Sequence, residues 1–421
     1  MAGLSKAREA ALKVLVAVEK DGAYLNLCLR ETLTKSKLDP RDSALATELS
    51  FGVMKNKLFL DNIISNISSV KPKKLSVWIH NILRIGIYSI RFLEKIPPRA
   101  TVDECVRLSR RYGHSASAGF VNAVLRKSIE CGDFLPQDKK SDEYISVKYS
   151  FPLWLVKKWH RYGEELFRSM NEAPPVTVRV NTKKRNTLPE GFEKTELSPH
   201  AYYFTRGGSV ENSEEYINGE ITVQDEASQF AVSLLGIEEG NTVLDLCAAP
   251  GGKSTYAAAL CGEKGKVISC DVHEHKLMLI DKNAERLGLF NIETMQNDAS
   301  LYNDSFKEAF DIVIADVPCS GLGIIRRRPD IKWAKTEEGI NELALLQRKI
   351  VLNAAKYVKK GGRLMYSTCT INEAENEENV KYFLENTQGF SLIKGFENYG
   401  RQLLPSKDKT DGFFVAVFER K

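Results

Sequence analysis

Two cysteines occupy positions that suit nucleophilic chemistry. Cys319 stands three residues after Asp316, just past the strand-like segment 311–315, and Cys369 stands just past a second such segment, 363–366. A thiolate is a soft nucleophile that can add to an electron-poor ring carbon. If the two strands are neighbours in a parallel sheet, their ends lie about 5 Å apart, and both thiols can reach one pocket. The residues alone leave open which thiol attacks.

A cysteine without such a setting is more often a small buried apolar side chain. This is the interpretation for five of the remaining cysteines. They are Cys28, Cys105, Cys131, Cys261 and Cys270.

A glycine-rich turn further upstream has the features of a nucleotide-cofactor site. Small residues and two glycines let the backbone approach a ligand closely, and a helix that begins near Ser254 directs its positive end there. A phosphate-binding P-loop also ends in Gly-Lys-Ser, but it needs a glycine where this chain has Cys247. The dinucleotide pattern GxGxxG is absent. The turn therefore favours a nucleoside cofactor without a triphosphate, held by Cys247, Ala248, Ala249, Pro250, Gly251, Gly252 and Lys253.

Acidic residues end four successive strand-like segments: Asp245, Asp271, Asp298 and Asp316. Asp271 follows the glycine turn at the distance where a carboxylate accepts hydrogen bonds from ribose hydroxyls. Asp298 is the candidate for an adenine amino group. One acid at a strand end is usually only a helix cap, whereas four of them line one edge of a sheet. We expect Asp271, Asp298 and Asp316 to take part in cofactor binding.

The elements that position these residues belong to residues 226–421, where strands and amphipathic segments alternate. Such alternation predicts an α/β, Rossmann-like domain with a mostly parallel sheet and ligands at the carboxyl ends of its strands. Amphipathic segments separate the first five strands, and the last strand forms an antiparallel hairpin with 391–396 at one edge. The expected strands are 242–246, 266–270, 292–295, 311–315, 363–366 and 413–418.

The rest of the chain has other periods. Residues 1–135 read as helix after helix, and the stretch 77–93 is apolar nearly all round, as a central buried helix would be. This predicts an all-α domain. Residues 136–225 begin as a polar, Gly- and Pro-broken linker and continue as a small α+β subdomain.

Charge is unevenly spread along the chain. The net charge of the whole protein is +5, but residues 1–140 carry 24 Lys and Arg against 14 Asp and Glu, a balance of +10. A basic N-terminal part on a slightly acidic body indicates a polyanion-binding module. The alternative interpretation is a solvated helical surface that is merely rich in lysine.

Several classes of protein are excluded by composition. There is no apolar run of 18 residues to span a membrane, and the N-terminal segment mixes charges into its apolar positions, unlike a signal peptide. The eight cysteines form no CxxC pair and do not cluster with the six histidines, so that neither a disulfide scaffold nor a metal site is expected. The sequence predicts a cytoplasmic monomer without a metal.

Three motifs carry a resemblance to a known family. DLCAAPGGKS, DVPCSGLGIIRRRPDIKW and YSTCT resemble the RNA cytosine-5 methyltransferases of the Sun/RsmB type, and VQDEAS resembles the entry to their catalytic domain. RIGIYSIRFL and FVNAVLRK, within 4–130, resemble the NusB-type RNA-binding fold that precedes it. The resemblance covers the whole chain. Ser254 stands where Thr is common and Thr370 where Ser is more usual.

The resemblance implies S-adenosyl-L-methionine as cofactor and carbon 5 of a cytosine in 16S rRNA as target. It assigns the nucleophile to Cys369, which adds to carbon 6, and gives Cys319 to product release. The chemistry also needs an acid near ring nitrogen 3, which Asp316 can supply, and a base that removes the carbon-5 proton. Attack at carbon 6 makes carbon 5 nucleophilic enough to accept a methyl group. The group that activates Cys369 cannot be read from the sequence.

A basic loop follows Cys319 closely. We expect Arg326, Arg327 and Arg328 to bind RNA phosphates beside a base drawn out of its stack, with Lys332 and Trp333 extending that surface. A solvated basic loop is the alternative. At the level of the whole protein, the alternatives are a non-catalytic NusB-like RNA-binding or ribosome assembly factor, which needs no paired thiols, and a P-loop nucleotidase, which Cys247 disfavours.

Overall fold

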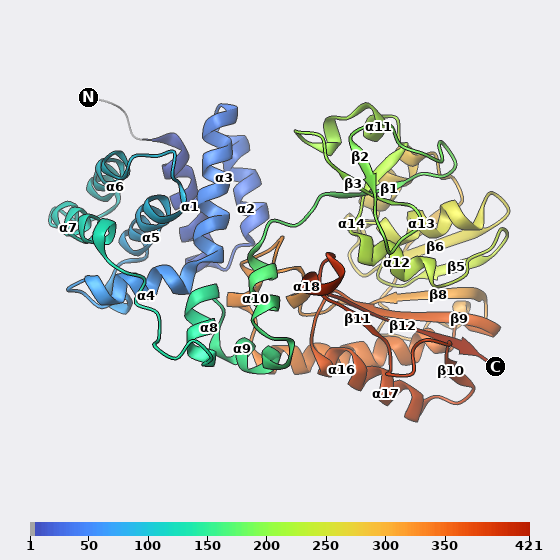
Figure 1. The fold of residues 1–421 in the computed structure, drawn as a ribbon. Coiled ribbons are helices and arrows are strands. Elements are labelled where there is room, and N and C mark those ends of the chain that lie inside the picture. The colour runs from blue at the N-terminus through green and yellow to red at the C-terminus, as the bar shows by residue number, and fades with distance from the viewer. Residues whose placement is uncertain (1–4) are drawn as a thin grey trace. The chain divides into compact units, whose positions relative to one another are not determined.

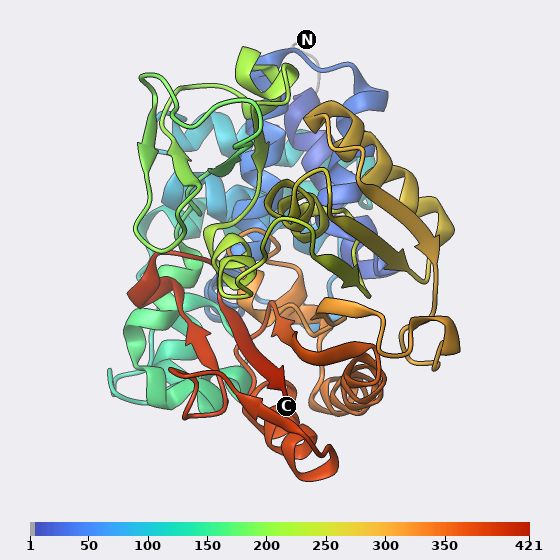
Figure 2. The same ribbon diagram turned by 90° about the vertical axis from the view of Figure 1, so that its right-hand side faces the viewer.

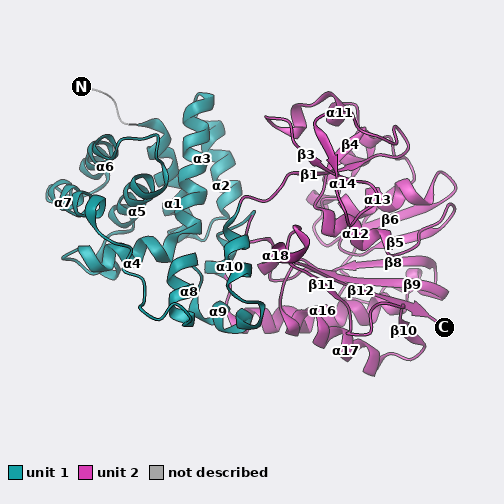
Figure 3. Ribbon diagram, viewed as in Figure 1, with its two compact units in different colours: residues 1–172, 327–334 teal, residues 173–326, 335–421 magenta. Residues whose placement is uncertain are grey.

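The computed structural model describes residues 5–421, which form two compact units (Figures 1 and 3). Unit 1 contains the chain up to Glu172 together with Arg327–Ala334, and unit 2 contains Ala173–Arg326 and Lys335–Lys421. Unit 1 therefore continues past residue 135, and the small sheet within 136–225 belongs to unit 2. The three-part division of the chain stays a prediction, whereas the expected classes of fold are confirmed below.

Unit 1 is built from helices, as its sequence period predicts. The apolar stretch near residue 80 forms α5, which begins after Ser76, whose hydroxyl accepts a hydrogen bond from Ile79 N at 3.3 Å. Its buried residues face all sides, so α5 is the central helix of an all-α core. The helices are α1 (Lys6–Asp21), α2 (Leu25–Ser36), α3 (Pro40–Lys55), α4 (Lys57–Ile67), η1 (Pro72–Lys74), α5 (Val77–Phe92), α6 (Pro98–Tyr112), α7 (Ser117–Glu130), α8 (Asp142–Tyr149), α9 (Leu153–Trp159), η2 (His160–Tyr162) and α10 (Glu164–Asn171).

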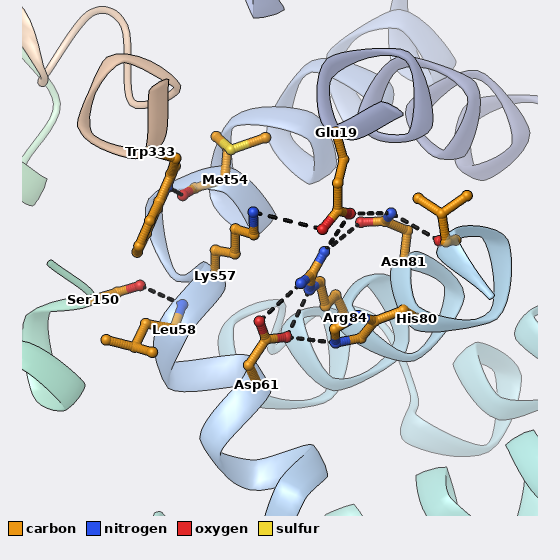
Figure 4. A network of polar contacts seen from close by, with 11 residues as sticks. Glu19, Met54, Lys57, Leu58, Asp61, His80, Asn81, Arg84, Ser150 and Trp333 are labelled. Atoms are coloured by element: carbon orange, nitrogen blue, oxygen red, sulfur yellow. Dashed lines mark hydrogen bonds and ion pairs between the residues drawn. The ribbon is translucent and has the colours of Figure 1, made fainter. Parts of the chain in front are cut away.

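A buried arginine joins three of these helices (Figure 4). Arg84 of α5 donates two hydrogen bonds to Asp61 of α4, at 2.7 and 2.8 Å, and one to Glu19 of α1 at 2.7 Å. His80 lies 2.7 Å from Asp61 as well. Burial raises the pKa of Asp61, but hydrogen bonds from His80 and Arg84 and the charge of Arg84 outweigh it and lower the pKa to about 2.

Residues 327–334 pack within unit 1 although their chain neighbours belong to unit 2. Trp333 Nε1 donates to the carbonyl of Met54 at 2.9 Å, and Lys332 Nζ donates to that of Lys55 at 2.8 Å (Figure 4 shows Trp333 beside Met54). Both carbonyls belong to the last turn of α3, where a helix leaves its acceptors without internal partners. The segment therefore caps α3.

The same segment also reaches the start of α2. The N-cap residue of that helix, Tyr24, makes no side-chain capping bond. Instead, Asp330 Oδ2 accepts a hydrogen bond from Leu25 N at 3.5 Å, and the Arg328 guanidinium lies 4.9 Å from the Tyr24 ring centre. Residues 327–334 thus supply hydrogen-bond partners to the C-terminal end of α3 and the N-terminal end of α2.

Unit 2 is an α/β unit around a large, mostly parallel sheet of order β10-β12-β9-β8-β5-β6-β7, with β11 paired to β12. Strands β9, β8, β5, β6 and β7 are parallel, whereas β12 runs antiparallel between β9 and β10. Figure 2 shows this end of the sheet from another side, with β12 in red. The strands are β5 (Thr242–Asp245), β6 (Lys266–Asp271), β7 (Ile292–Gln296), β8 (Phe310–Asp316), β9 (Val358–Thr368), β10 (Phe390–Leu392), β11 (Arg401–Leu403) and β12 (Phe413–Arg420).

The parallel sheet and the antiparallel hairpin follow the predicted strands closely. One connection is different: the expected amphipathic segment between β7 and β8 is a loop with one short turn of 3-10 helix, η4 (Asp304–Phe306), because turn-forming residues such as Asn303 interrupt it. The other helices of this region are α12 (Glu226–Ser233), α13 (Gly252–Cys261), α14 (Glu274–Leu287), η5 (Leu322–Ile324), α16 (Glu337–Ala355), η6 (Glu373–Glu375), α17 (Glu377–Asn386) and α18 (Pro405–Asp408), and α15 (Ile331–Ala334) lies in the segment of unit 1.

A second, antiparallel sheet of order β2-β3-β1-β4 lies in unit 2 as well. Its strands lie within the residues 136–225 that were predicted to contain a small α+β subdomain, whereas the helices α8, α9 and α10 of that range belong to unit 1. The elements around this second sheet are β1 (Thr177–Val180), β2 (Phe192–Lys194), β3 (Ala201–Phe204), η3 (Val210–Asn212), α11 (Glu214–Ile217) and β4 (Ile221–Val223). Over residues 5–421, none of the helices combines the length and the apolar character that crossing a membrane requires.

Candidate active site

The two cysteines meet because β8 and β9 are neighbours. Asp316, the last residue of β8, stands opposite Ser367 of β9, and the Ser367 hydroxyl donates to Asp316 Oδ1 at 2.7 Å. The loops that leave these strands bring Cys319 Sγ within 3.1 Å of Cys369 Sγ. The strands are neighbours, which was the condition for the expectation from the sequence, and the two thiols lie in contact.

The two residues that directly follow the cysteines in the chain are hydrogen-bonded to each other. Ser320 Oγ and Thr370 Oγ1 lie 2.8 Å apart, and both side chains are buried. Either Ser or Thr supplies the hydroxyl that this bond requires, which explains why Thr370 is accepted where Ser is more usual. The bond fixes the separation of the two loops and hence that of the thiols.

The Cys319 thiol is strongly affected by its surroundings. The hydrogen bond with Cys369, burial, and the charge of the nearby Glu375 carboxylate together raise the pKa of the Cys319 thiol far above its usual value. Cys319 is therefore a proton-bearing thiol at neutral pH.

Asp316 lies between a cation and a hydroxyl. Its Oδ2 forms an ion pair with Lys253 of α13, and its Oδ1 accepts from Ser367. The Lys253 ammonium also lies 5.2 Å from the centre of the Phe413 ring. These contacts hold the carboxylate at the carboxyl edge of the sheet, at the end of the strand that leads to Cys319.

The cofactor turn is folded as the glycine pattern predicts. Ala248 N donates to Cys270 O at 2.7 Å, and Gly251 N to Ala248 O at 2.7 Å. Gly251 has a φ of +100°, and a Cβ there would lie 3.1 Å from the Ile280 side chain, so that this position favours glycine. Gly252 then begins α13, whose N-terminus faces the strand ends.

Asp245 lies beneath this turn. Burial raises its pKa to about 7, although the Ser254 hydroxyl donates to Oδ2 at 2.7 Å and Lys253 is nearby. Its other oxygen, Oδ1, is buried without a hydrogen-bond partner in the described structure. A ligand donor would satisfy it.

A cavity of about 480 Å³ opens beside the turn and has the make-up of a nucleoside site. Asp271 and Asp298 both line it, and Asp271 Oδ1 is oriented by the amide of His273 at 2.9 Å. Asn297 contributes an amide nitrogen that is buried without a partner in the described structure. Carboxylates at two strand ends and an unsatisfied donor fit a nucleoside cofactor with ribose hydroxyls and a polar base.

A second cavity of about 250 Å³ adjoins the first and shares Cys247, Ala249 and Asp316 with it. Of the described residues, Cys369 is among those that line this second cavity, and Cys319 is not. A cofactor in the first cavity and a flat ring in the second would therefore meet at Asp316. The predicted residues of the turn and the strand ends line one or both cavities, apart from Gly251, whose backbone shapes the turn.

The basic loop is less exposed than its sequence suggests. Arg326 is 6% exposed and donates to the carbonyls of Thr410, at 3.1 Å, and Ala173, at 3.3 Å. Arg327 and Arg328 are half-buried in unit 1. The expectation that Lys332 extends an RNA-binding surface is wrong, because its side chain is fully buried.

Two functional candidates were not found from the sequence. Arg179 of β1 is buried and donates a hydrogen bond to Gln224 Oε1. It also donates to Gly252 O at 2.6 Å and to Thr255 Oγ1 at 3.0 Å, and so binds the first turn of α13. Glu375 is fully buried beside Ser320. No local pattern marks either one, since both act through partners distant in the sequence. Within residues 5–421, no group of three or more His, Cys, Asp or Glu side chains is arranged to hold a metal.

The sheet order, the cofactor turn and the strand-end thiols define a methyltransferase of the Rossmann-like class. A family model described as 16S rRNA methyltransferase RsmB/F matches residues 232–419, and the NusB family model matches residues 5–130. The chain belongs to the family of ribosomal RNA small subunit methyltransferases B.

Individual relatives agree with this assignment. The chain is 37% identical to the probable ribosomal RNA small subunit methyltransferase B of Bacillus subtilis, over 98% of both proteins. It is 31% identical to ribosomal RNA small subunit methyltransferase B of Escherichia coli, over 92% of both. The crystal structure of the protein PH0851 superposes on the whole chain with a TM-score of 0.82 at 28% identity.

Proposed function

We propose that this protein transfers a methyl group from S-adenosyl-L-methionine to carbon 5 of a cytosine in 16S rRNA. One observation carries the proposal: two thiols lie 3.1 Å apart just past two strand ends, and one of them, Cys369, lines a small cavity that adjoins a nucleoside-sized cavity. A methyltransferase that acts on an oxygen or nitrogen atom needs no thiol, whereas carbon 5 of cytosine needs covalent activation. The reaction on ribosomal RNA would take place in the cytoplasm.

In this proposal Cys369 attacks and Asp316 assists. The Cys369 thiolate donates an electron pair to carbon 6 of the ring, the 5,6 double bond opens, and the negative charge spreads towards ring nitrogen 3. Asp316, the acid proposed to lie near that nitrogen, stabilises the charge there. Lys253, paired with Asp316, holds the carboxyl group in place. S-adenosyl-L-methionine supplies the methyl group when bound.

Product release is the proposed role of Cys319. A base removes the carbon-5 proton, the electron pair re-forms the 5,6 double bond, and the bond from carbon 6 to Cys369 breaks. The Cys319 thiol, 3.1 Å from Cys369 Sγ, can donate a hydrogen bond to the departing thiolate. This role follows the family resemblance and is supported by the raised pKa of Cys319.

The cofactor residues are proposed by position. Asp271 would accept from the ribose hydroxyls and Asp298 from the adenine amino group, while the turn 247–253 would surround the remainder of the cofactor. For the RNA, Arg327 and Arg328 remain proposed phosphate contacts. Arg326 would take part only if its bonds to the Thr410 and Ala173 carbonyls were released.

Bisulfite sequencing of rRNA tests this proposal. RNA from cells with the protein should contain 5-methylcytosine at a position that is unmodified when the gene is deleted, and purified protein should restore it. A methyl group that appears on another atom, or no change in rRNA, would contradict the proposal. The non-catalytic RNA-binding alternative predicts no difference in methylation at any cytosine.

A further inference from the structure

The Glu375 carboxylate is a buried charge held by neutral donors. Its Oε1 accepts from Ser320 N at 2.8 Å and from Gln347 Nε2 at 3.0 Å. Its Oε2 accepts from Ser320 Oγ at 2.6 Å and from Asn372 Nδ2 at 3.0 Å. Four donors are a full complement for a carboxylate, and burying a carboxylate without them would be strongly unfavourable. The site is therefore built around a negative charge.

This charge lies directly beside the thiol pair. Ser320 N belongs to the peptide bond that follows Cys319, so that one carboxylate oxygen contacts the backbone of the Cys319 loop. Ser320 Oγ also bonds to Thr370, the residue after Cys369. Glu375 thus holds the Cys319 loop at the point where it meets the Cys369 loop.

The thiol pair contains one S–H···S bond, and its direction decides which sulfur can carry charge. The thiol that keeps its proton donates it, and the other sulfur, as thiolate, accepts. A carboxylate beside Cys319 disfavours a second negative charge there. The hydrogen bond with Cys369, the burial of Cys319 and the Glu375 charge all raise the pKa of Cys319.

Other polar groups also lie near the pair. The Cys369 amide, 3.3 Å from Cys319 Sγ, and the Gly321 amide donate to that sulfur and favour charge on it, but the net effect of its surroundings still raises the pKa of Cys319. Tyr366 of β9 donates its hydroxyl proton to the Glu375 carbonyl at 2.5 Å, and burial raises its pKa, so it stays neutral. The guanidinium of Arg348, on α16, is bonded to Asn379. Asp316, at the end of β8, is paired with Lys253.

We propose that Glu375 is a positioning residue that keeps the proton of the thiol pair on Cys319 and leaves the negative charge on Cys369. The proton lost on ionisation comes from Cys369 and goes to solvent, while the Cys319 proton remains in the S–H···S bond. Cys369 is then the sulfur with an electron pair free to attack. The inference takes its catalytic meaning from the proposed function, but the placement of the proton can be measured without substrate.

Glu375→Gln removes the charge and keeps the shape. The new amide group has a partner available, because Asn372 Oδ1 is buried without one in the described structure and can turn to accept from it. Glu375→Asp keeps the charge and serves as the conservative variant. Glu378→Gln removes an acid from an exposed position of α17, outside the thiol pair and its hydrogen bonds, and serves as the matched control.

The experiment is competitive alkylation of the full-length protein with iodoacetamide from about pH 5 to pH 10, with labelling at each cysteine quantified by peptide mass spectrometry. In the native protein and in the Glu378→Gln and Glu375→Asp variants, Cys369 should react first. In Glu375→Gln the ratio of Cys369 to Cys319 labelling should fall about tenfold, equivalent to about one pH unit.

A folded Glu375→Gln protein, with the native circular dichroism spectrum, that keeps the native labelling ratio would overturn the inference. If Glu375→Gln does not fold, Glu375→Asp decides the matter: labelling of Cys319 before Cys369 in that variant would also overturn it. A shifted ratio in a protein that methylates no cytosine would instead leave the inference intact and refute the proposed function.

Discussion

Cys319 Sγ and Cys369 Sγ lie 3.1 Å apart, at a separation that places them in hydrogen-bond contact without a covalent bond. A disulfide would require about 2.05 Å. One of the two sulfurs therefore donates a hydrogen bond to the other. Their pairing determines how each should respond to substitution and to oxidation.

Alanine variants should separate the two thiols. Cys369→Ala should abolish methyl transfer and form no covalent complex with RNA, because the variant lacks the proposed nucleophile. Cys319→Ala should still attack and methylate, and then accumulate a protein–RNA complex that is stable on a denaturing gel. An inert Cys319→Ala protein together with a trapped Cys369→Ala complex would reverse the two roles.

Mild oxidation should inactivate the protein reversibly. The sulfurs need to approach by only about 1 Å to form a disulfide, and a thiolate on Cys369 would start the exchange. Treatment with diamide should abolish methyl transfer, and dithiothreitol should restore it. Peptide mapping should find the link between Cys319 and Cys369. The matched comparison is Cys105, which is fully buried in unit 1 and should remain a free thiol throughout; inactivation without a disulfide would contradict this prediction.

Asp271→Asn should weaken cofactor binding. The variant loses the charged acceptor that lines the larger cavity, and hydrogen bonds to charged groups are worth about 1.5–3 kcal/mol. The dissociation constant for S-adenosyl-L-methionine, measured by calorimetry without RNA, should rise at least about tenfold. Asp281→Asn is the control, since that acid lies on α14 outside the cavity and accepts a bond from Thr294 at 3.0 Å. Equal effects of the two variants would contradict the proposed ribose contact.

Asp61→Asn should destabilise unit 1 in a pH-dependent way. The folded pKa of Asp61, about 2, is below its unfolded value of 3.8, so the carboxylate contributes stability that is present above about pH 4 and is lost as pH falls towards 2. The shift corresponds to about 2 kcal/mol. In urea unfolding followed by circular dichroism, the variant should be less stable than the native protein at pH 7, and the difference should shrink at about pH 3. A difference in stability between the two proteins that does not depend on pH would show that the Asp61 charge does not stabilise the fold.

The sequence predicts the parts of this structure that repeat or alternate. The parallel sheet follows from the spacing of strands and helices, and the buried helix α5 from its apolar faces. The cofactor turn could be placed because small residues, Gly251 and Gly252 limit the available conformations. The meeting of the thiols remained conditional, since strand order depends on how β8 and β9 pack and not on either segment alone.

The residues that could not be predicted act through distant partners. Lys332 stands in a run of basic residues that resembles a solvated loop, yet it caps a helix whose carbonyl lies 277 positions away in the chain. Glu375 is one of several acids in a short acidic stretch, and only its contact with Ser320, 55 positions away, distinguishes it. A local pattern cannot report either relationship.

The packing of residues 327–334 within unit 1 has a consequence for recombination between related genes. A gene fragment ending at Glu172 would encode every α-helix from α1 to α10 but neither Trp333 nor Asp330, which complete the ends of α3 and α2. Recombination that exchanged only the N-terminal part between relatives would therefore separate these helices from the segment that fits them. Stable chimeras should be those in which the two stretches come from the same parent.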